Sequence, residues 1–292
     1  MKKFSLIFTI IIFQSVFSQQ ADFLKIRKYK VAFLDNQIKE TSGLSFFNGK
    51  LYTFNDSGNQ PQLFEIDRSS GNITNVLKIN AENKDWEALT NDGSYFYIGD
   101  FGNNAGTRKD LKIYKVPFQT AEISNDEVKA INFYYPEQTD FTSKNTETNF
   151  DAEALIYLNG KLHLFTKEWS SKSTTHYVID PQIYESQKAE KVESYPTGFV
   201  ITDASYFDKK LYLIGYTKKT EVFLDIFNET APGIFFKEAP QHYYLGSSLS
   251  IGQIEGVEVN ESGVYISGEK FNSPLGGAKQ SFYFIPKEKL KH

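Results

Sequence analysis

The sequence contains no cysteine, only one methionine, two tryptophans and four histidines among 292 residues. Without cysteine the chain can form no disulfide, thiolate nucleophile, thiolate zinc site or cysteine-linked lipid anchor. The few histidines make zinc a poor candidate as well. There is no excess of basic residues either, since 32 Lys and Arg face 36 Asp and Glu for a formal charge of -4. This balance argues against a nucleic-acid polymer or an anionic lipid surface as a partner.

Several catalytic signatures are also missing. The sequence shows no Ser/His/Asp order, nucleophile elbow, phosphate-binding P-loop or dinucleotide fingerprint. Nucleophilic serine chemistry is therefore weakly supported. Stability has to come from an apolar core, with or without a bound metal.

The N-terminus has the form of a secretory signal. An apolar run from Phe4 to Phe13 follows Lys2 and Lys3 and precedes the small residue Ser18. The run is short for a membrane span, although an uncleaved anchor is the alternative. We therefore expect residues 1–18 to be removed, which leaves 30 Lys and Arg against 36 Asp and Glu, a charge of -6. The mature chain would be exported to the periplasm or the extracellular space, with no membrane span.

The composition of the remaining chain favours strands. The sequence has 26 Phe and 18 Tyr, residues that are enriched in β-sheets. About 270 residues remain after the signal, enough for one large all-β domain. We predict that residues 19–292 form this single domain and that the protein is a monomer.

A repeated unit organises the chain. Each copy has an apolar strand, a polar turn and a second strand, as in DWEALTNDGSYFYIGD, and the copies start near Glu40, Asp85, Asp151, Ile201 and Ile254. The spacing of 66, 50 and 52 residues between Glu87, Glu153, Asp203 and Glu255 leaves room for four short strands per copy. Such a repeat is typical of a β-propeller, for which we prefer five blades over six.

Two further segments complete the predicted ring. The stretch from Leu24 to Asp35 alternates polar and apolar residues as a strand does, and it has no blade of its own. We expect it to pair with Ser281 to Lys287 and so to close the last blade and cover two open edges. Residues 136–149 are polar and explain the long interval of 66 residues as an insertion, either a binding loop over one face or a passive surface excursion.

The repeat predicts a metal site on the propeller axis. The first strand of each blade lines the central channel, so a residue repeated at one position reaches the axis once per blade. Neighbouring carboxylates repel each other, and a cation removes that conflict. Calcium suits such a ring better than magnesium because it accepts six to eight oxygens in flexible geometry. The alternative is that these acids cap strands or accept backbone hydrogen bonds. The candidate ligands are Glu40, Ser42, Glu87, Glu153, Asp203 (with Thr202 as the alternative in its column) and Glu255.

The loops that follow the second strands form a candidate ligand site at one mouth of the channel. In the loop from Gly99 to Arg108, glycines and asparagines allow backbone N–H groups to point at an anion, and Arg108 offers a guanidinium fork. A tight inter-strand turn, with Arg108 paired to an acid of the neighbouring blade, is an equally good interpretation. The candidate ligand-binding residues are Asn55, Asp56, Asp100, Asn103, Asn104, Arg108 and Glu269.

These motifs resemble a group of secreted bacterial β-propellers labelled esterase-like or phytase-like. The matching stretches are Glu40 to Leu44 with Asn55 to Gly58, Asp85 to Leu89 with Gly99 to Asn104 and Arg108, and Glu255 to Val257. More distantly the pattern is similar to the five-bladed calcium-activated nucleotidases, or apyrases. That resemblance implies calcium in the central tunnel at the positions of Glu87, Glu153 and Glu255, and cleavage of phosphoanhydrides. The chain departs from the nucleotidases at Thr202–Asp203, where they carry a clear Glu.

Two functions remain open on the sequence. In the first, the protein is a calcium-dependent phosphohydrolase of a small phosphorylated molecule, with Glu87 taking a proton from water and Arg108 stabilising the developing charge. In the second, it is a non-catalytic propeller that binds a ligand or partner in the cell envelope and uses calcium for structure. The non-catalytic function requires fewer assumptions, since propellers host many non-catalytic functions.

Overall fold

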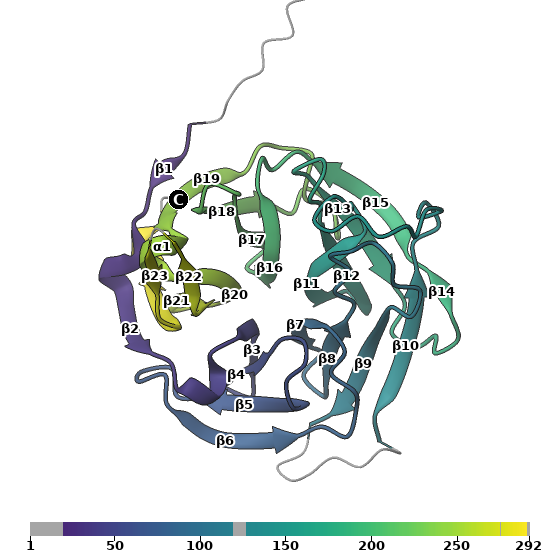
Figure 1. Cartoon of the computed structure of the whole chain (residues 1–292), viewed down its shortest axis with the longest axis horizontal. Helices are drawn as coiled ribbons and strands as arrows, with labels where there is room; N and C mark the ends of the chain where they lie inside the picture. Colours follow the sequence, from purple (N-terminus) through teal and green to yellow (C-terminus); the bar gives the residue numbers. More distant parts are fainter. Residues whose placement is uncertain (1–19, 119–126, 275, 291–292) are drawn as a thin grey trace, which may run out of the picture.

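The computed structural model describes residues 20–118, 127–274 and 276–290, and the predicted signal peptide 1–18 lies outside them. Five antiparallel sheets stand around a common axis as the blades of a β-propeller (Figure 1). The fold class and the preferred number of five blades are thus confirmed. Among the described residues, no helix has the length and hydropathy needed to cross a membrane.

Each blade is a four-stranded meander whose first strand is innermost. The first blade contains β3 (Thr41–Phe47), β4 (Lys50–Asn55), β5 (Gln62–Ile66) and β6 (Ile73–Lys78), and the second contains β7 (Trp86–Asn91), β8 (Tyr95–Asp100), β9 (Lys112–Pro117) and β10 (Lys129–Tyr134). The third contains β11 (Asp151–Leu158), β12 (Lys161–Lys167), β13 (Thr174–Ile179) and β15 (Glu190–Tyr195). The fourth contains β16 (Val200–Phe207), β17 (Lys210–Tyr216), β18 (Glu221–Asn228) and β19 (Gln241–Ser247).

The last blade is closed by the N-terminal segment, as predicted. It contains β20 (Gln253–Asn260), β21 (Gly263–Glu269), β24 (Ser281–Pro286) and, as its outer strand, β2 (Lys30–Phe33). Strand β2 runs antiparallel to β24, with Phe33 opposite Ser281. The predicted strand is shorter than expected, because residues Ile26–Tyr29 form a 3-10 turn instead. Ahead of that turn, β1 (Asp22–Phe23) adds to the fourth blade as a parallel strand beside β19.

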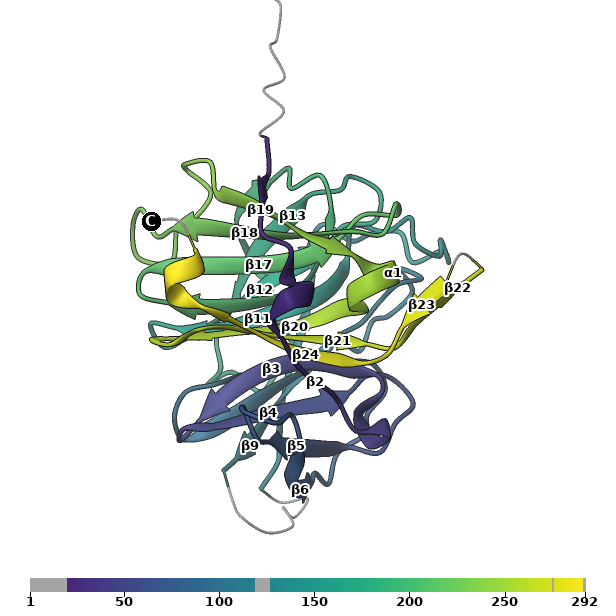
Figure 2. The ribbon, with the colours of Figure 1, turned by 90° about the vertical axis from the view of Figure 1, so that its left-hand side faces the viewer.

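Short elements decorate this frame. Strand β14 (Gln187–Lys188) pairs with β10, so a segment of the third blade also contacts the second. A hairpin of β22 (Phe271–Ser273) and β23 (Gly276–Ala278) projects from the last blade beside helix α1 (Ser248–Ile251) (Figure 2). The remaining 3-10 turns are η2 (Asn36–Ile38) and η3 (Lys287–Lys289).

Local sequence explains the tight first hairpins of the blades. Asn48 and Gly49 have φ angles of 49° and 75°, and Asn159 and Gly160 have 52° and 79°. Positive φ at both central residues gives the two-residue turn whose twist matches that of paired strands. The Asn-Gly dipeptides therefore set the pairing of β3 with β4 and of β11 with β12.

The apolar core lies between the blades. Five hydrophobic clusters occur among the described residues, one between each neighbouring pair of blades around the ring. Aromatic side chains carry much of this packing, as where Phe96 of the second blade meets Phe47 and Tyr52 of the first with ring centroids 4.8 and 5.0 Å apart. Burial of such large side chains is the main stabilising term in the absence of disulfides. The five innermost strands are thereby held side by side around the axis.

The insertion at residues 136–149 packs against the second blade. It contains no strand, as predicted, and its Lys144 and Thr146 donate backbone hydrogen bonds to Ala105 and Asn104. The Gln138 side chain donates to the carbonyl of Gly106 over 2.8 Å. The insertion therefore supports the loop from Gly99 to Arg108 at one face of the ring.

Candidate functional site

The repeated column of the sequence coincides with an irregularity in every innermost strand. The pairing of the first two strands shifts between Trp86 and Ala88, which leaves Glu87 as an extra residue, and the third and fifth blades treat Glu153 and Glu255 in the same way. A β-bulge turns its extra residue out of the ladder and re-aims the side chain. The structure thus brings Glu87, Glu153 and Glu255 to equivalent positions near the same end of the channel.

The first and fourth blades place hydroxyl groups there instead. Ser42 and Thr202 occupy the irregular region of β3 and β16. The Ser42 hydroxyl donates to the carbonyl of Glu87 over 3.1 Å, and the Thr202 hydroxyl donates to the carbonyl of Ile254 over 2.8 Å. Each hydroxyl thereby ties one innermost strand to that of the next blade. Both groups are structural bridges in this arrangement.

Asp203 lies one residue beyond this column and has its own partners. Its carboxylate is fully buried and accepts backbone hydrogen bonds from Ala204 over 2.8 Å and from Val257 over 2.7 Å. Burial raises its pKa well above the usual range, against the lowering effect of those N–H groups. The sequence left Thr202 and Asp203 open for the fourth blade, and the structure places Thr202 in the column.

A second set of side chains surrounds the first. Lys167, Tyr216 and Glu269 are the last residues of β12, β17 and β21, and Asp56 directly follows β4. The second strands run antiparallel to the innermost ones, so their ends meet the beginnings of the innermost strands. We call the resulting group the acidic mouth; it comprises Glu40, Asp56, Asp85, Glu87, Asp151, Glu153, Lys167, Tyr216, Glu255 and Glu269.

The carboxyl groups of the acidic mouth are strongly perturbed. Burial, followed by the charges of Glu153 and Asp85, raises the pKa of Glu87 well above its usual range. Burial raises the pKa of Glu255 and of Glu269 to about 8, with further contributions from neighbouring acids. Burial and the charge of Glu40 raise the pKa of Asp56 to about 7. These groups resist ionisation together because each is buried away from bulk solvent and lies close to other acids.

Lys167 is the one basic residue at the centre of this group in the described part of the chain. Its side chain is 5% exposed, and its Nζ donates to Glu153 Oε1 over 2.8 Å. The ammonium also lies 5.0 Å from the ring centroid of Trp169 and 5.4 Å from that of Tyr216. Glu153, foremost among several acids, raises the pKa of Lys167 well above its usual range despite burial. A permanent positive charge therefore sits among more carboxyl groups than it can neutralise.

One glycine brings two of the carboxylates close together. A Cβ atom on Gly102 would lie 2.4 Å from Asp85 Oδ2 and 2.5 Å from Glu87 Oε1. Both oxygens therefore pack against the bare Cα of this residue. A larger side chain would have to displace them, so the glycine of the GDFGNN motif has a role in placing carboxylates.

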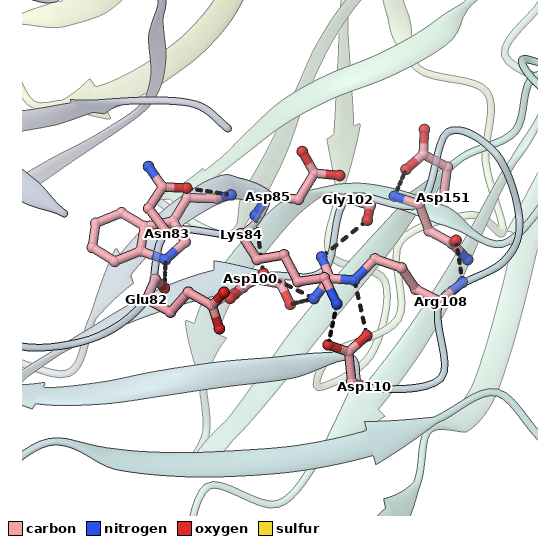
Figure 3. A network of polar contacts seen from close by, with 11 residues as sticks. Glu82, Asn83, Lys84, Asp85, Asp100, Gly102, Arg108, Asp110 and Asp151 are labelled. Carbon is pink, nitrogen blue, oxygen red and sulfur yellow. Dashed lines mark hydrogen bonds and ion pairs between the residues drawn. The ribbon is translucent and has the colours of Figure 1, made fainter. Parts of the chain in front are cut away.

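The loop from Gly99 to Arg108 directs one backbone N–H group, that of Asn103, at a carboxyl group of the protein itself. The N–H of Asn103 donates to Asp151 Oδ1 over 2.6 Å (Figure 3). Trp169 Nε1 donates to the other oxygen of Asp151 over 2.9 Å and to Asn104 Oδ1 over 3.0 Å. Asn103 and Asn104 thus link the second blade to the third.

Arg108 is engaged within its own blade. Its guanidinium donates to Asp100 Oδ1 over 2.9 Å, to Asp110 Oδ1 over 3.2 Å and to the carbonyl of Gly102 over 3.1 Å (Figure 3). The side chain is 9% exposed. This arrangement favours the interpretation of a tight turn, but the expected partner was wrong, because the acids that Arg108 contacts belong to its own blade and not to the neighbouring one. The predicted role of Arg108 in catalysis or phosphate binding stays a prediction.

Asn55, Glu40 and Asp100 complete the set of predicted site residues. Asn55 accepts from the N–H of Glu40 over 3.2 Å and donates to the carbonyl of Gln37 over 2.7 Å, which fixes the turn before β3. The Glu40 carboxylate accepts from Asn59 over 2.8 Å and is 41% exposed. Asp100 Oδ2 is buried and has no hydrogen-bond partner among the described atoms.

The donor chemistry of the mouth fits calcium. Carboxylate oxygens are the ligands that this hard cation prefers, and Glu255 Oε2 is buried with no hydrogen-bond partner in the described structure. Within the described residues, no three His, Asp or Glu side chains stand in a geometry that could hold a metal ion. The side chains of Glu87, Glu153 and Glu255 would therefore have to reorient to hold one ion, and Lys167 would have to release Glu153.

The fold and mouth define the class of protein as a β-propeller with an acidic channel entrance. No protein-family model matches the chain, and no curated protein matches its sequence. Similar solved structures include hydrazine synthase of Kuenenia stuttgartiensis, with a TM-score of 0.41 and 13% identity over 83% of this chain and 58% of that one. The match thus spans less than two thirds of that structure's own length.

Two further similar structures are described as enzymes. One is described as an oxidoreductase (glucose dehydrogenase) of Thermus thermophilus, with a TM-score of 0.45 and 11% identity over 88% of this chain and 98% of that one. The other is described as a 6-phosphogluconolactonase of Bacteroides uniformis, with a TM-score of 0.36 and 12% identity over 88% and 72%. Similarity at this level carries no functional conclusion. The phytase-like and nucleotidase-like grouping stays a prediction.

Proposed function

We propose that the protein is an exported, ligand-binding β-propeller whose acidic mouth takes up calcium. The observation that carries this proposal is the buried group of Glu87, Glu153 and Glu255 from three blades, with raised pKa values and only Lys167 at its centre as a compensating cation among the described residues. A divalent cation would offset both the burial and the mutual repulsion that raise the pKa values of these groups. Calcium suits the mouth because it tolerates irregular arrangements of oxygen ligands.

Calcium in the mouth would supply two things. It would cross-link blades that otherwise repel each other at this end, and it would present a positive charge to an anionic ligand such as a phosphorylated molecule. Glu87, Glu153 and Glu255 are the residues that would hold it. The loops around Asp56 and Asn104 would then form the walls that contact the ligand.

The test is the effect of calcium on the melting temperature. Calcium at a hundredfold excess over its dissociation constant stabilises a protein by about 2.7 kcal/mol. For a domain of this size that is a rise of roughly 5–10 °C over the chelated protein. The double variant Glu87→Gln/Glu153→Gln should lose this rise. No rise in the unmodified protein would overturn the proposal.

Glu258→Gln is the matched control. Glu258 lies on β20 three residues from Glu255, and its carboxylate accepts from the Phe46 N–H over 3.0 Å and the Ser205 hydroxyl over 2.8 Å. It faces a separate polar cavity beside Ser205 and is not in the mouth. This variant should melt at a different temperature and still respond to calcium.

A second candidate is calcium-dependent phosphohydrolysis, and the pKa values favour it. Glu255 and Glu269 have pKa values of about 8, the range in which a carboxyl group can exchange a proton near neutral pH. Turnover of nucleoside di- and triphosphates or inositol phosphates, measured with calcium and with chelator, tests this candidate. If calcium raises the melting temperature and none of these compounds is turned over, only the binding function is supported.

A further inference from the structure

A second concave site lies at the outer edge of the last blade, away from the acidic mouth. The N-terminal turn and β2 contribute Arg27, Lys30 and Phe33, and helix α1 and the segment after β23 form the facing wall with Lys279. Figure 2 looks onto this edge, where β2, α1 and β23 come together. The cavity has a volume of about 360 Å³. That volume is in the range of sites for small ligands.

The charge of this cavity is opposite to that of the mouth. Its three charged lining residues are all basic, and no Asp or Glu lines it. Among the described residues, Arg27, Lys30 and Lys279 form no ion pair. Some exposed lysines elsewhere do form ion pairs, as in the pair of Lys84 with Asp110 at 2.6 Å. On a chain with a net charge of -4, three such cations around one cavity are a distinct feature.

An aromatic ring holds two of these cations together. Lys30 Nζ lies 3.6 Å from the centroid of the Phe33 ring, and Lys279 Nζ lies 5.7 Å from it. Phe33 is 54% exposed, so its ring lies at the surface of the cavity that it lines. Cation–π attraction keeps both ammonium groups over the cavity although they repel each other. An anion between them would remove that repulsion.

We propose that this cavity binds a phosphate group carried by a small molecule. A guanidinium and two ammonium groups offer more donors than a single carboxylate can accept, and a phosphate has both the charge and the oxygens to use them. The proposal is independent of calcium in the mouth. It assigns a role to the N-terminal segment beyond closing the ring.

The test uses inorganic pyrophosphate as the probe in the presence of chelator, so that calcium plays no part. Calorimetric titration should detect binding to the unmodified protein. The variant Arg27→Gln/Lys279→Gln should bind about tenfold or more weakly, the effect of losing charge-assisted hydrogen bonds. Both residues are exposed, so the variant should melt at nearly the unmodified temperature.

The control is Lys218→Gln/Lys219→Gln, which removes two cations from an exposed turn of the fourth blade. It should bind pyrophosphate as the unmodified protein does. Equal weakening in the control, or no binding by the unmodified protein at millimolar pyrophosphate, would overturn the proposal. Vesicles with phosphatidylglycerol form a second arm. If the unmodified protein sediments with these vesicles and the variant does not, the phosphate belongs to a lipid headgroup. If the unmodified protein binds pyrophosphate but does not sediment with the vesicles, the phosphate belongs to a free molecule.

Discussion

Removing calcium should make the stability of the protein depend on pH in an unusual direction. Glu255 and Glu269 have pKa values of about 8 in the folded chain, against an ordinary value of 4.5. A carboxyl group with a raised pKa binds a proton in the folded state that it has already lost in the unfolded state. The stability that these two groups contribute to the calcium-free protein is therefore present at low pH and is lost as the pH rises through about 8.

The size of the effect follows from the number of protons retained. Each group that is protonated when folded and ionised when unfolded lowers the free energy of unfolding by about 1.4 kcal/mol per pH unit. Glu255 and Glu269 together lower it by about 3 kcal/mol between pH 6.5 and 7.5. For a chain of this length the melting temperature should fall by roughly 5–10 °C over that interval.

The pH window has to avoid the buried histidines. Burial lowers the pKa of His163 to about 4 and also lowers that of His176. A histidine with a depressed pKa costs stability as the pH falls below its ordinary value of 6.5, which opposes the carboxyl effect. Above about pH 7 these two histidines are mostly neutral in both states, and the carboxyl groups decide the slope. Near pH 6.5 the unfolded histidines are still about half charged and offset about half of the effect of Glu255 and Glu269.

The assay is thermal unfolding at several pH values from 6.5 to 8.5, with chelator and with saturating calcium. Calcium should flatten the slope because it favours the ionised carboxylates in the folded state. A melting temperature that is constant with pH in chelator would refute the reasoning about the mouth. A slope that calcium leaves unchanged would show that the ion binds elsewhere.

Three substitutions extend this account. Gly102→Ala should push the carboxylates of Asp85 and Glu87 apart and reduce the rise in melting temperature with calcium. Overpacking should lower the free energy of unfolding by at most about 1–3 kcal/mol. An unchanged rise with calcium would show that Gly102 does not place the carboxylates that bind it. Lys167→Met removes the central cation, so the chelated protein should lose about 3–5 kcal/mol in denaturant titrations and recover most of it with calcium; equal stability with chelator would contradict its role. Asp203→Asn should lower the free energy of unfolding by about 1–3 kcal/mol because a backbone N–H loses its acceptor, and the rise in melting temperature with calcium should remain. Loss of that rise would show that Asp203 is a calcium ligand after all.

The arrangement of the blades was predictable from the sequence because a propeller repeats its local rules. Asn48–Gly49 and Asn159–Gly160 specify their turns within four residues, and the apolar strands recur at a regular interval. Closure by the N-terminal strand followed from the need to cover open edges. The 3-10 turn at Ile26–Tyr29 was missed, because its alternating pattern is also that of a strand.

The site was only partly predictable. The column of Glu87, Glu153 and Glu255 is visible in the sequence because each sits at the same distance from its turn. The β-bulge that orients these side chains is not visible in the sequence. In the fourth blade it is the position of the bulge that places Thr202, and not Asp203, in the column. Nothing in the local sequence of Lys167 shows that its ammonium reaches Glu153 across the hairpin.

The most direct measurement is a crystal structure of the protein grown with calcium, with the ion located by its anomalous signal. We expect a peak in the acidic mouth at about 2.3–2.6 Å from oxygens of Glu87, Glu153 or Glu255. Lys167 Nζ should then have left Glu153. A mouth that holds only water while Lys167 stays on Glu153, or an ion bound at another surface, would contradict the central claim.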